Sequence, residues 1–148
     1  MLQIKDLREE KDLRQQDIAK LIGIERSTYS SYETERDTIP INHLNNLCNF
    51  FDVSIDYALG LTKKTKYPNS RKDIDRDIIL IRLKELRKKY KLTQHEIVKK
   101  LNIARSTWAG YEYGNYLIPT LILYELASKY NTSVDYIVGK VDINYLAK

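Results

Sequence analysis

The chain has 148 residues, enough for one medium domain or for two small domains of about 70 residues each. Charged residues make up 30% and hydrophobic residues 43% of the chain, a balance that excludes extensive disorder. The net charge is mildly basic, +5. A single cysteine, Cys48, excludes an intrachain disulfide framework, and the longest apolar run, 78–81, is too short to span a bilayer. We therefore expect a cytoplasmic protein that does not associate with a membrane.

Apolar residues recur at helical spacing along almost the whole chain, and only five glycines and three prolines interrupt them. The pattern predicts an all-α protein. The first helices are expected over 3–11, 15–21 and 26–34, then one after Pro40 and one from Ser54 to Gly60. A second set follows over 75–90, 94–100 and 105–113, then after Pro119, and from Ser133 to Gly139.

Helix ends carry recognisable capping residues. Ser54 and Ser133 are natural N-caps, and the glycines six residues after them are natural C-caps. Thr93 and Glu96 form a capping box at the start of the helix over 94–100. The first half of the chain has Arg14 in place of Thr93, so we expect this cap to be lost there.

The chain repeats itself. A shift of 79 residues aligns 4–62 with 83–141 without a gap, and 21 of the 59 pairs are identical. A unit of about 60 residues is too long for a solenoid repeat and fits a small helical domain used twice. We expect domains over 1–62 and 75–148, with a polar, basic linker over 63–74. The polar, basic stretch between the two copies, the eleven residues 62–72, could extend by roughly 36 Å at most.

The motif that recurs is specific. It contains Leu13, Gln15, Ile18, Ala19 and Gly23, followed by Arg26-Ser27-Thr28 and Tyr32-Glu33; in the second half, Leu92-Thr93-Gln94, Arg105-Ser106-Thr107 and Tyr111-Glu112 take these places. It resembles the Cro/repressor-type (xenobiotic-response-element type) helix-turn-helix domain of phage and bacterial regulators. The resemblance implies two tandem five-helix domains, each with a third helix that enters the DNA major groove.

Elementary geometry agrees with this resemblance. A third helix of about eight residues is roughly 12 Å long, close to the width of the major groove. The turn before it needs a residue that tolerates positive φ, which Gly23 supplies in the first repeat and Asn102 in the second.

The resemblance assigns the DNA contacts by position. Base-edge contacts fall on Arg26, Ser27 and Ser31, and on Arg105, Ser106 and Gly110, although glycine has no side chain with which to read a base. Phosphate contacts fall on Gln15, Thr28 and Arg36, and on Gln94 and Thr107. The glutamines could instead cap their helices, and the arginines could be solvated surface cations. The family's ion pair between helices one and three falls on Arg8–Glu33 and Arg87–Glu112.

Other polar and aromatic residues receive structural assignments. Tyr29 and Trp108 occupy positions typical of the core, Cys48 reads as a buried small residue, and His43 and His95 read as surface residues. No cluster has metal-ligand spacing and no nucleophile pairs with a base, so we expect neither a metal, a cofactor nor catalysis.

The two repeats differ in charge. Residues 1–62 carry a net charge of −4, residues 63–77 carry +3 and residues 78–148 carry +6. Affinity for DNA depends largely on phosphate neutralisation, so the linker and the second repeat are better suited to bind it.

The second repeat is also more apolar than the first at six positions: Tyr113, Tyr116, Leu117, Leu121, Ile122 and Tyr124 replace Thr34, Asp37, Thr38, Asn42, His43 and Asn45. We expect these residues to form a protein interface, in a homodimer or with another partner, or to pack within the chain.

The function predicted is sequence-specific binding of double-stranded DNA by a transcriptional regulator, a repressor, that reads an operator through the third helix of each repeat. The alternative is a protein-binding module, such as an antitoxin-like partner, an antirepressor or a phage inhibitor, that uses the fold as a scaffold. Because the two readers differ, we expect an asymmetric operator.

Overall fold

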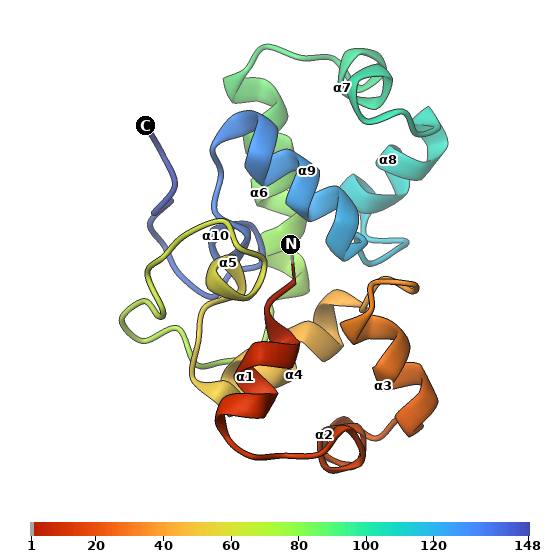
Figure 1. Cartoon of the computed structure of the whole chain (residues 1–148). Helices are drawn as coiled ribbons and strands as arrows, with labels where there is room; N and C mark the ends of the chain where they lie inside the picture. The colour runs from red at the N-terminus through yellow and green to blue at the C-terminus, as the bar shows by residue number, and fades with distance from the viewer. Residues whose placement is uncertain (1) are drawn as a thin grey trace. The chain divides into compact units, whose positions relative to one another are not determined.

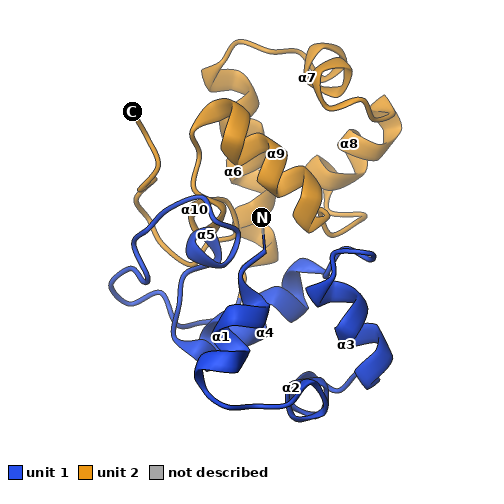
Figure 2. Ribbon diagram, in the orientation of Figure 1, with its two compact units in different colours: residues 1–73 blue, residues 74–148 orange. Residues whose placement is uncertain are grey.

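The computed structural model describes residues 2–148, within which it has ten α-helices and no β-strand. The chain divides into two compact units, residues 1–73 and 74–148 (Figure 2). The prediction of an all-helical protein with two tandem helix-turn-helix domains is confirmed.

Each unit contains five helices (Figure 1). The first unit contains α1 (Ile4–Glu10), α2 (Gln15–Ile22), α3 (Arg26–Glu33), α4 (Ile41–Phe51) and α5 (Ile55–Ala58). The second contains α6 (Arg76–Lys89), α7 (Gln94–Leu101), α8 (Arg105–Tyr113), α9 (Thr120–Tyr130) and α10 (Val134–Ile137). The predicted elements recur in the predicted order, with ends displaced by a few residues at most.

The turn between the second and third helix of each unit is left-handed, as predicted. Gly23 has a φ of 72° and Asn102 a φ of 56°. Both residues end a helix, and the left-handed conformation there lets the chain reverse into α3 or α8.

Capping hydrogen bonds largely follow the sequence. The hydroxyls of Ser54 and Ser133 accept the backbone N–H of Tyr57 and Tyr136 at the starts of α5 and α10. The Thr93–Glu96 capping box is present in α7.

The start of α2 departs from the prediction. The cap expected to be lost at Arg14 is lost only in part, because the carboxylate of Asp17 still accepts the Arg14 backbone N–H at 2.9 Å. The same carboxylate pairs with the Arg14 side chain, so Asp17 keeps half of the box.

The cores of the two units are built from equivalent residues. Tyr29 and Trp108 are fully buried at matching positions of α3 and α8, as predicted, and Cys48 is buried in α4. His95 is exposed and His43 half-buried. Among residues 2–148, no group of three or more His, Cys, Asp or Glu side chains is arranged to hold a metal ion.

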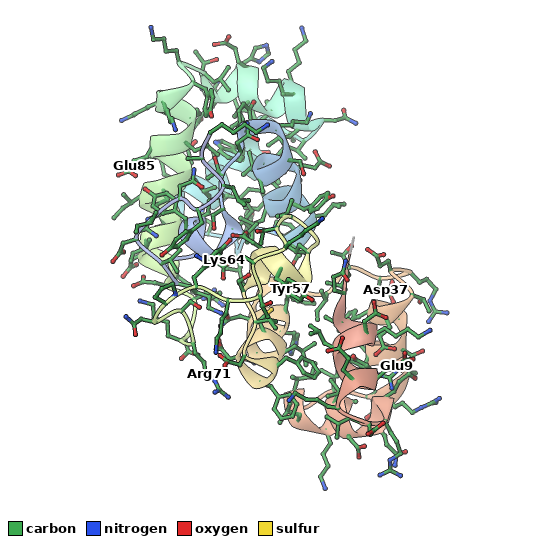
Figure 3. The ribbon with its side chains drawn as sticks, turned by 60° about the vertical axis from the view of Figure 1, so that its left-hand side comes forward. Glu9, Asp37, Tyr57, Lys64, Arg71 and Glu85 are labelled. Carbon is green, nitrogen blue, oxygen red and sulfur yellow. The ribbon has the colours of Figure 1, made fainter. Side chains whose placement is uncertain are left out.

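The segment expected to link the repeats packs on the first unit. The side-chain amides of Asn45 and Asn49 in α4 donate to the carbonyl of Lys72 at 3.2 and 3.0 Å. Tyr67 is 3% exposed, and its hydroxyl donates to Asp56 at 2.8 Å. Lys64 and Arg71 of this segment are exposed and are labelled in Figure 3. Residues 62–72 are therefore part of a folded unit and not a free, extensible connection.

In each unit, the segment after the fifth helix accepts a hydrogen bond from the serine that caps that helix. The backbone N–H of Ser54 donates to the carbonyl of Thr65 at 2.7 Å. In the second unit the backbone N–H of Ser133 donates to the side-chain oxygen of Asn144 at 2.8 Å. Asn144 and Thr65 are 79 residues apart, so the structural repeat continues past its recognisable sequence.

Candidate nucleic-acid interface

The starts of α3 and α8 present short polar side chains and one arginine each. Arg26, Ser27 and Thr28 are exposed in the first turn of α3. In α8, Arg105 and Ser106 are exposed and Thr107 is half-buried. Helices of eight and nine residues are about 12 and 14 Å long, which suits insertion into a major groove.

A bidentate ion pair anchors each of these helices to the first helix of its unit. The guanidinium of Arg8 donates to the carboxylate of Glu33 at 2.7 and 3.0 Å. Arg87 donates to Glu112 at 3.0 Å through both nitrogens. Both arginines also donate to a carbonyl in the loop before the second helix, that of Leu13 or Leu92.

The buried carboxylates stay ionised because their partners outweigh desolvation. Burial opposes ionisation of Glu33, but hydrogen bonds from Arg8 and Gln15 hold its pKa below its ordinary value. Burial also opposes ionisation of Glu112, but hydrogen bonds from Arg87, Trp108 and Gln94 lower its pKa below the ordinary value. The bond from Trp108 is donated by its indole N–H. This indole contact was not predicted, since tryptophan at a core position carries no sequence signal for the partner of its N–H.

The glutamines at the starts of α2 and α7 also face these carboxylates. The amide nitrogen of Gln15 donates to Glu33 at 3.0 Å, and that of Gln94 donates to Glu112 at 3.3 Å. One amide N–H of each residue is therefore directed into its own unit. The second amide hydrogen of each glutamine could still donate to a phosphate, so the phosphate contact stays a prediction.

Two of the predicted base-reading positions are buried, which corrects the sequence-based assignment. Ser31 is 2% exposed, and its hydroxyl donates to the carbonyl of Thr28 within α3. Gly110 is buried under the ring of Tyr116, which a methyl group at this position would overlap. In each unit the loop after the reading helix folds back and donates a backbone N–H to the carbonyl of Ser31 or Gly110. These residues position that loop and do not present a side chain to a base.

Arg36 lies on the loop after α3 and is exposed. Its neighbour Glu35 has a φ of 57°, which turns the chain there. The equivalent residue in the second unit is Asn115, also exposed, so only the first unit carries a cation at this position.

The two units share a fold but differ in net charge. Residues 1–73 contain twelve Lys and Arg against twelve Asp and Glu, and are neutral. Residues 74–148 contain thirteen Lys and Arg against eight Asp and Glu, a net charge of +5. Lys99 and Lys100, exposed near the end of α7, are part of this excess.

The apolar residues that distinguish the second unit are divided between surface and interior. Tyr113 is 65%, Tyr116 61% and Leu121 44% exposed, and Leu117 and Tyr124 are half-buried. Ile122 is buried beside Leu123 in α9, which agrees with the alternative of packing within the chain.

Residues 4–57 match a helix-turn-helix family model, and residues 81–143 match a helix-turn-helix domain model. The chain is a tandem pair of Cro/repressor-type helix-turn-helix domains. Together the two matches include all of α3 and α8 and both buried ion pairs.

Similar proteins carry the description HTH-type transcriptional regulator and come from Bacillus subtilis (strain 168). The uncharacterized HTH-type transcriptional regulator YobD is 44% identical over 61 residues, which are 41% of this chain and 54% of YobD. The HTH-type transcriptional regulator ImmR is 40% identical over 63 residues, 43% of this chain and 50% of ImmR. The chain therefore spans about half the length of these relatives. No solved structure matches the chain significantly.

Proposed function

We propose that this tandem helix-turn-helix protein is a sequence-specific, double-stranded DNA-binding regulator of transcription that reads an operator through α3 and α8. The observation that carries the proposal is the exposed arginine in the first turn of each third helix, on a helix fixed by a buried ion pair. A rigid helix with an arginine at its start can pair bidentately with guanine in the major groove. The names of the similar proteins support regulation of transcription.

We assign the DNA affinity mainly to the second unit. Its net charge of +5 favours phosphate contact, whereas the first unit is neutral and has Glu25 directly before Arg26. The two readers differ in sequence beyond the shared Arg-Ser-Thr, so the operator is asymmetric. We propose a repressor, because a bound chain would exclude the polymerase from a promoter that overlaps its operator. It acts at the nucleoid in the cytoplasm; no described helix is long and apolar enough to cross a membrane.

Selection of the purified chain on a random duplex library at about 0.1 M salt, followed by sequencing, tests this function. We expect two enriched half-sites of different sequence. The Arg26→Ala/Arg105→Ala variant should lose the enrichment, whereas Lys148→Ala, which removes an exposed charge outside the reading helices, should keep it. Failure of the wild-type chain to enrich any sequence would contradict the proposal.

A second candidate function is binding to protein, in a homodimer or with another partner. It is favoured by the exposure of Tyr113, Tyr116 and Leu121, since large apolar side chains that a unit leaves exposed can be covered by a partner. The first repeat supplies matched substitutions at these positions: Tyr113→Thr, Tyr116→Asp and Leu121→Asn. If the wild-type chain dimerises in light scattering and this triple variant is monomeric, the surface is the interface. If both have the same mass, it is not a dimer interface.

A further inference from the structure

The second unit begins with a helical extension that the first unit lacks. The internal repeat pairs Ile4, where α1 begins, with Leu83, and α6 begins seven residues before that position, at Arg76. The helix α6 therefore has 14 residues against the 7 of α1 (Figure 1). Because the first unit forms the same five-helix fold without this extension, the fold alone does not account for residues 76–82.

One face of the extension packs within the second unit. Ile79 is buried, and the guanidinium of Arg82 donates to the backbone carbonyls of Tyr136 and Val141. These contacts attach the first two turns of α6 to α10 and to the segment that follows it. The extension is therefore a fixed part of the second unit.

The opposite face of α6 carries four residues that lie on one side of the helix within two turns. They are Asp77, Leu80, Ile81 and Lys84, which we call the α6 stripe. Asp77 and Ile81 are exposed, Ile81 by 56%, and Leu80 and Lys84 are half-buried. The stripe presents two adjacent apolar residues with an acidic residue at one end and a basic residue at the other.

The end of α8 adds a tyrosine to this surface. The Tyr113 side chain is 65% exposed, and the amine nitrogen of Lys84 lies 5.7 Å from the centroid of its ring. A hollow of about 350 Å³ is lined by the four residues of the α6 stripe, Glu112 and Tyr113. Tyr113 follows Arg105 by eight residues, about 12 Å along α8, so the hollow lies at the opposite end of that helix from the reading arginine.

The two charges of the α6 stripe lack opposite charges within their own chain. Among residues 2–148, neither the Asp77 carboxylate nor the Lys84 amine forms an ion pair. They are about 10 Å apart along the helix axis, too far to pair with each other, and no residue three or four positions from either has the opposite charge. A bound partner can supply both opposite charges.

The order of residues along the α6 stripe is acidic, apolar, apolar, basic. In the reverse direction it is basic, apolar, apolar, acidic, so an antiparallel copy of the same stripe places each charge opposite its complement. A parallel copy would instead place like charges opposite each other. The stripe is therefore complementary to itself in one orientation only.

We propose that α6 binds α6 of a second copy of this chain, antiparallel about a two-fold axis that passes between Leu80 and Ile81. In this homodimer Asp77 of each copy lies opposite Lys84 of the other, and the interface is isologous, as two-fold symmetry requires. The inference goes beyond the proposed recognition of DNA and does not depend on it.

Sedimentation velocity of the whole chain from about 1 to about 500 µM tests the pairing. The wild-type chain should dimerise. Asp77→Lys produces a stripe with two lysines and Lys84→Asp a stripe with two aspartates, so each variant alone opposes like charges twice and should dimerise at least about ten-fold more weakly. An equimolar mixture of the two variants should form a heterodimer within about three-fold of wild-type affinity, because each lysine then faces an aspartate.

The matched controls make the same charge changes on other helices. Asp6→Lys alters an exposed acidic residue in the first turn of α1, and Lys99→Asp alters an exposed lysine of α7. Both should dimerise like the wild-type chain. A wild-type chain that stays monomeric at 500 µM would overturn the proposal, whether its α6 stripe is then free, covered by the first unit or bound to another protein. Equal dimerisation of the wild-type chain and the two stripe variants would also overturn it.

A cross-link between introduced cysteines tests the position of the axis. The two copies of residue 81 would lie almost level with each other, whereas the two copies of residue 88 would be about 22 Å apart along the helices. A short bismaleimide should therefore link Ile81→Cys into a dimer and should not link Lys88→Cys, and the native Cys48 is buried in both. Equal linking at the two positions, or none at residue 81, would overturn the antiparallel arrangement. Enrichment of half-sites by monomeric Asp77→Lys would leave the proposed function standing in either case.

Discussion

Arg87 and Glu112 form a bidentate pair, with Nε and one terminal nitrogen of the guanidinium each 3.0 Å from a carboxylate oxygen. The Glu112 side chain is fully buried and the Arg87 side chain is 16% exposed. The pair joins α6 to the last turn of α8, the helix that begins at Arg105. Trp108, the only tryptophan in the chain, donates to the same carboxylate, which makes its fluorescence a reporter of this unit.

Removal of one partner of this pair should destabilise the second unit. Arg87→Met leaves the Glu112 carboxylate buried without its cation, and we expect a loss of about 3 kcal/mol in the free energy of unfolding. Urea unfolding followed by Trp108 fluorescence measures it. Lys88→Met, an exposed neighbour on α6, is the control and should change it by less than about 0.5 kcal/mol. Equal effects of the two variants would show that the pair contributes nothing.

The same pair should make the unit sensitive to acid. The pKa of Glu112 is lower in the folded unit than its ordinary value of 4.5, so its stabilising contribution is complete above that value. It is lost as the pH falls through the depressed folded pKa. The urea midpoint of the Trp108 transition should therefore fall between pH 6 and pH 3. A midpoint that stays constant or rises would contradict the assignment.

One further carboxylate needs control in that experiment. The pKa of Glu96 is also lowered, by hydrogen bonds from Thr93, and its protonation acts in the same direction. The titration is therefore made in a Glu96→Gln background, and the acid-sensitive part that remains should shrink when Arg87→Met is added.

Asn144 should stabilise the second unit through the hydrogen bonds of its side chain. Its side-chain oxygen accepts the backbone N–H of Ser133 and of Leu146, and its amide donates to the carbonyl of Asn131 at 3.1 Å. Asn144→Ala removes this acceptor from the start of α10, and we expect a loss of about 1–3 kcal/mol. Asn115→Ala, on an exposed loop, is the control. A Trp108 transition that shifts equally in both variants would count against this role.

The sequence predicted the fold because the determining signals are local. Helical periodicity, Ser54 and Ser133 as N-caps, and Gly23 or Asn102 in the turn all act within a few residues. The ion pairs join distant residues, but the internal repeat places them twice at the same spacing, and the resemblance identified them.

The errors have a common physical cause, which is packing between segments of different composition. The loop after the reading helix covers Ser31 in the first unit and Gly110 in the second. This loop carries Asp37 in the first unit and Tyr116 at the equivalent position of the second. The ring of Tyr116 fills the space that a side chain at position 110 would need, which accounts for glycine there. The segment 62–72 is polar and basic, which is typical of a linker, yet two asparagines of α4 and the buried ring of Tyr67 hold it. The composition of a segment indicates how polar it is, but it does not indicate whether a side chain elsewhere in the fold donates a hydrogen bond to its backbone.

The two reading arginines should contribute unequally to DNA binding. Arg105→Ala should cost about 1–3 kcal/mol in binding to the selected operator and relax the preference at one base pair, while leaving non-specific binding nearly unchanged. Arg26→Ala should cost less, because the first unit is neutral and Glu25 adjoins Arg26. Anisotropy titrations on the operator and on a scrambled duplex measure both. An unchanged sequence preference in Arg105→Ala would remove this residue from the interface.

The lysines of the segment 62–72 should contribute through phosphates alone. Lys63 and Lys64 are exposed, and Lys66 forms an exposed pair with Asp52 at 3.0 Å that a phosphate could replace. Each phosphate contact contributes about 0.9 to the slope of log affinity against log salt concentration. The triple variant Lys63→Ala/Lys64→Ala/Lys66→Ala should therefore have a slope shallower by about 1–3, with its base preference unchanged. The control removes three exposed lysines elsewhere, Lys5, Lys88 and Lys148, and should keep the wild-type slope. Identical slopes for the wild-type chain and the triple variant would show that these three lysines do not contact phosphates of the bound DNA.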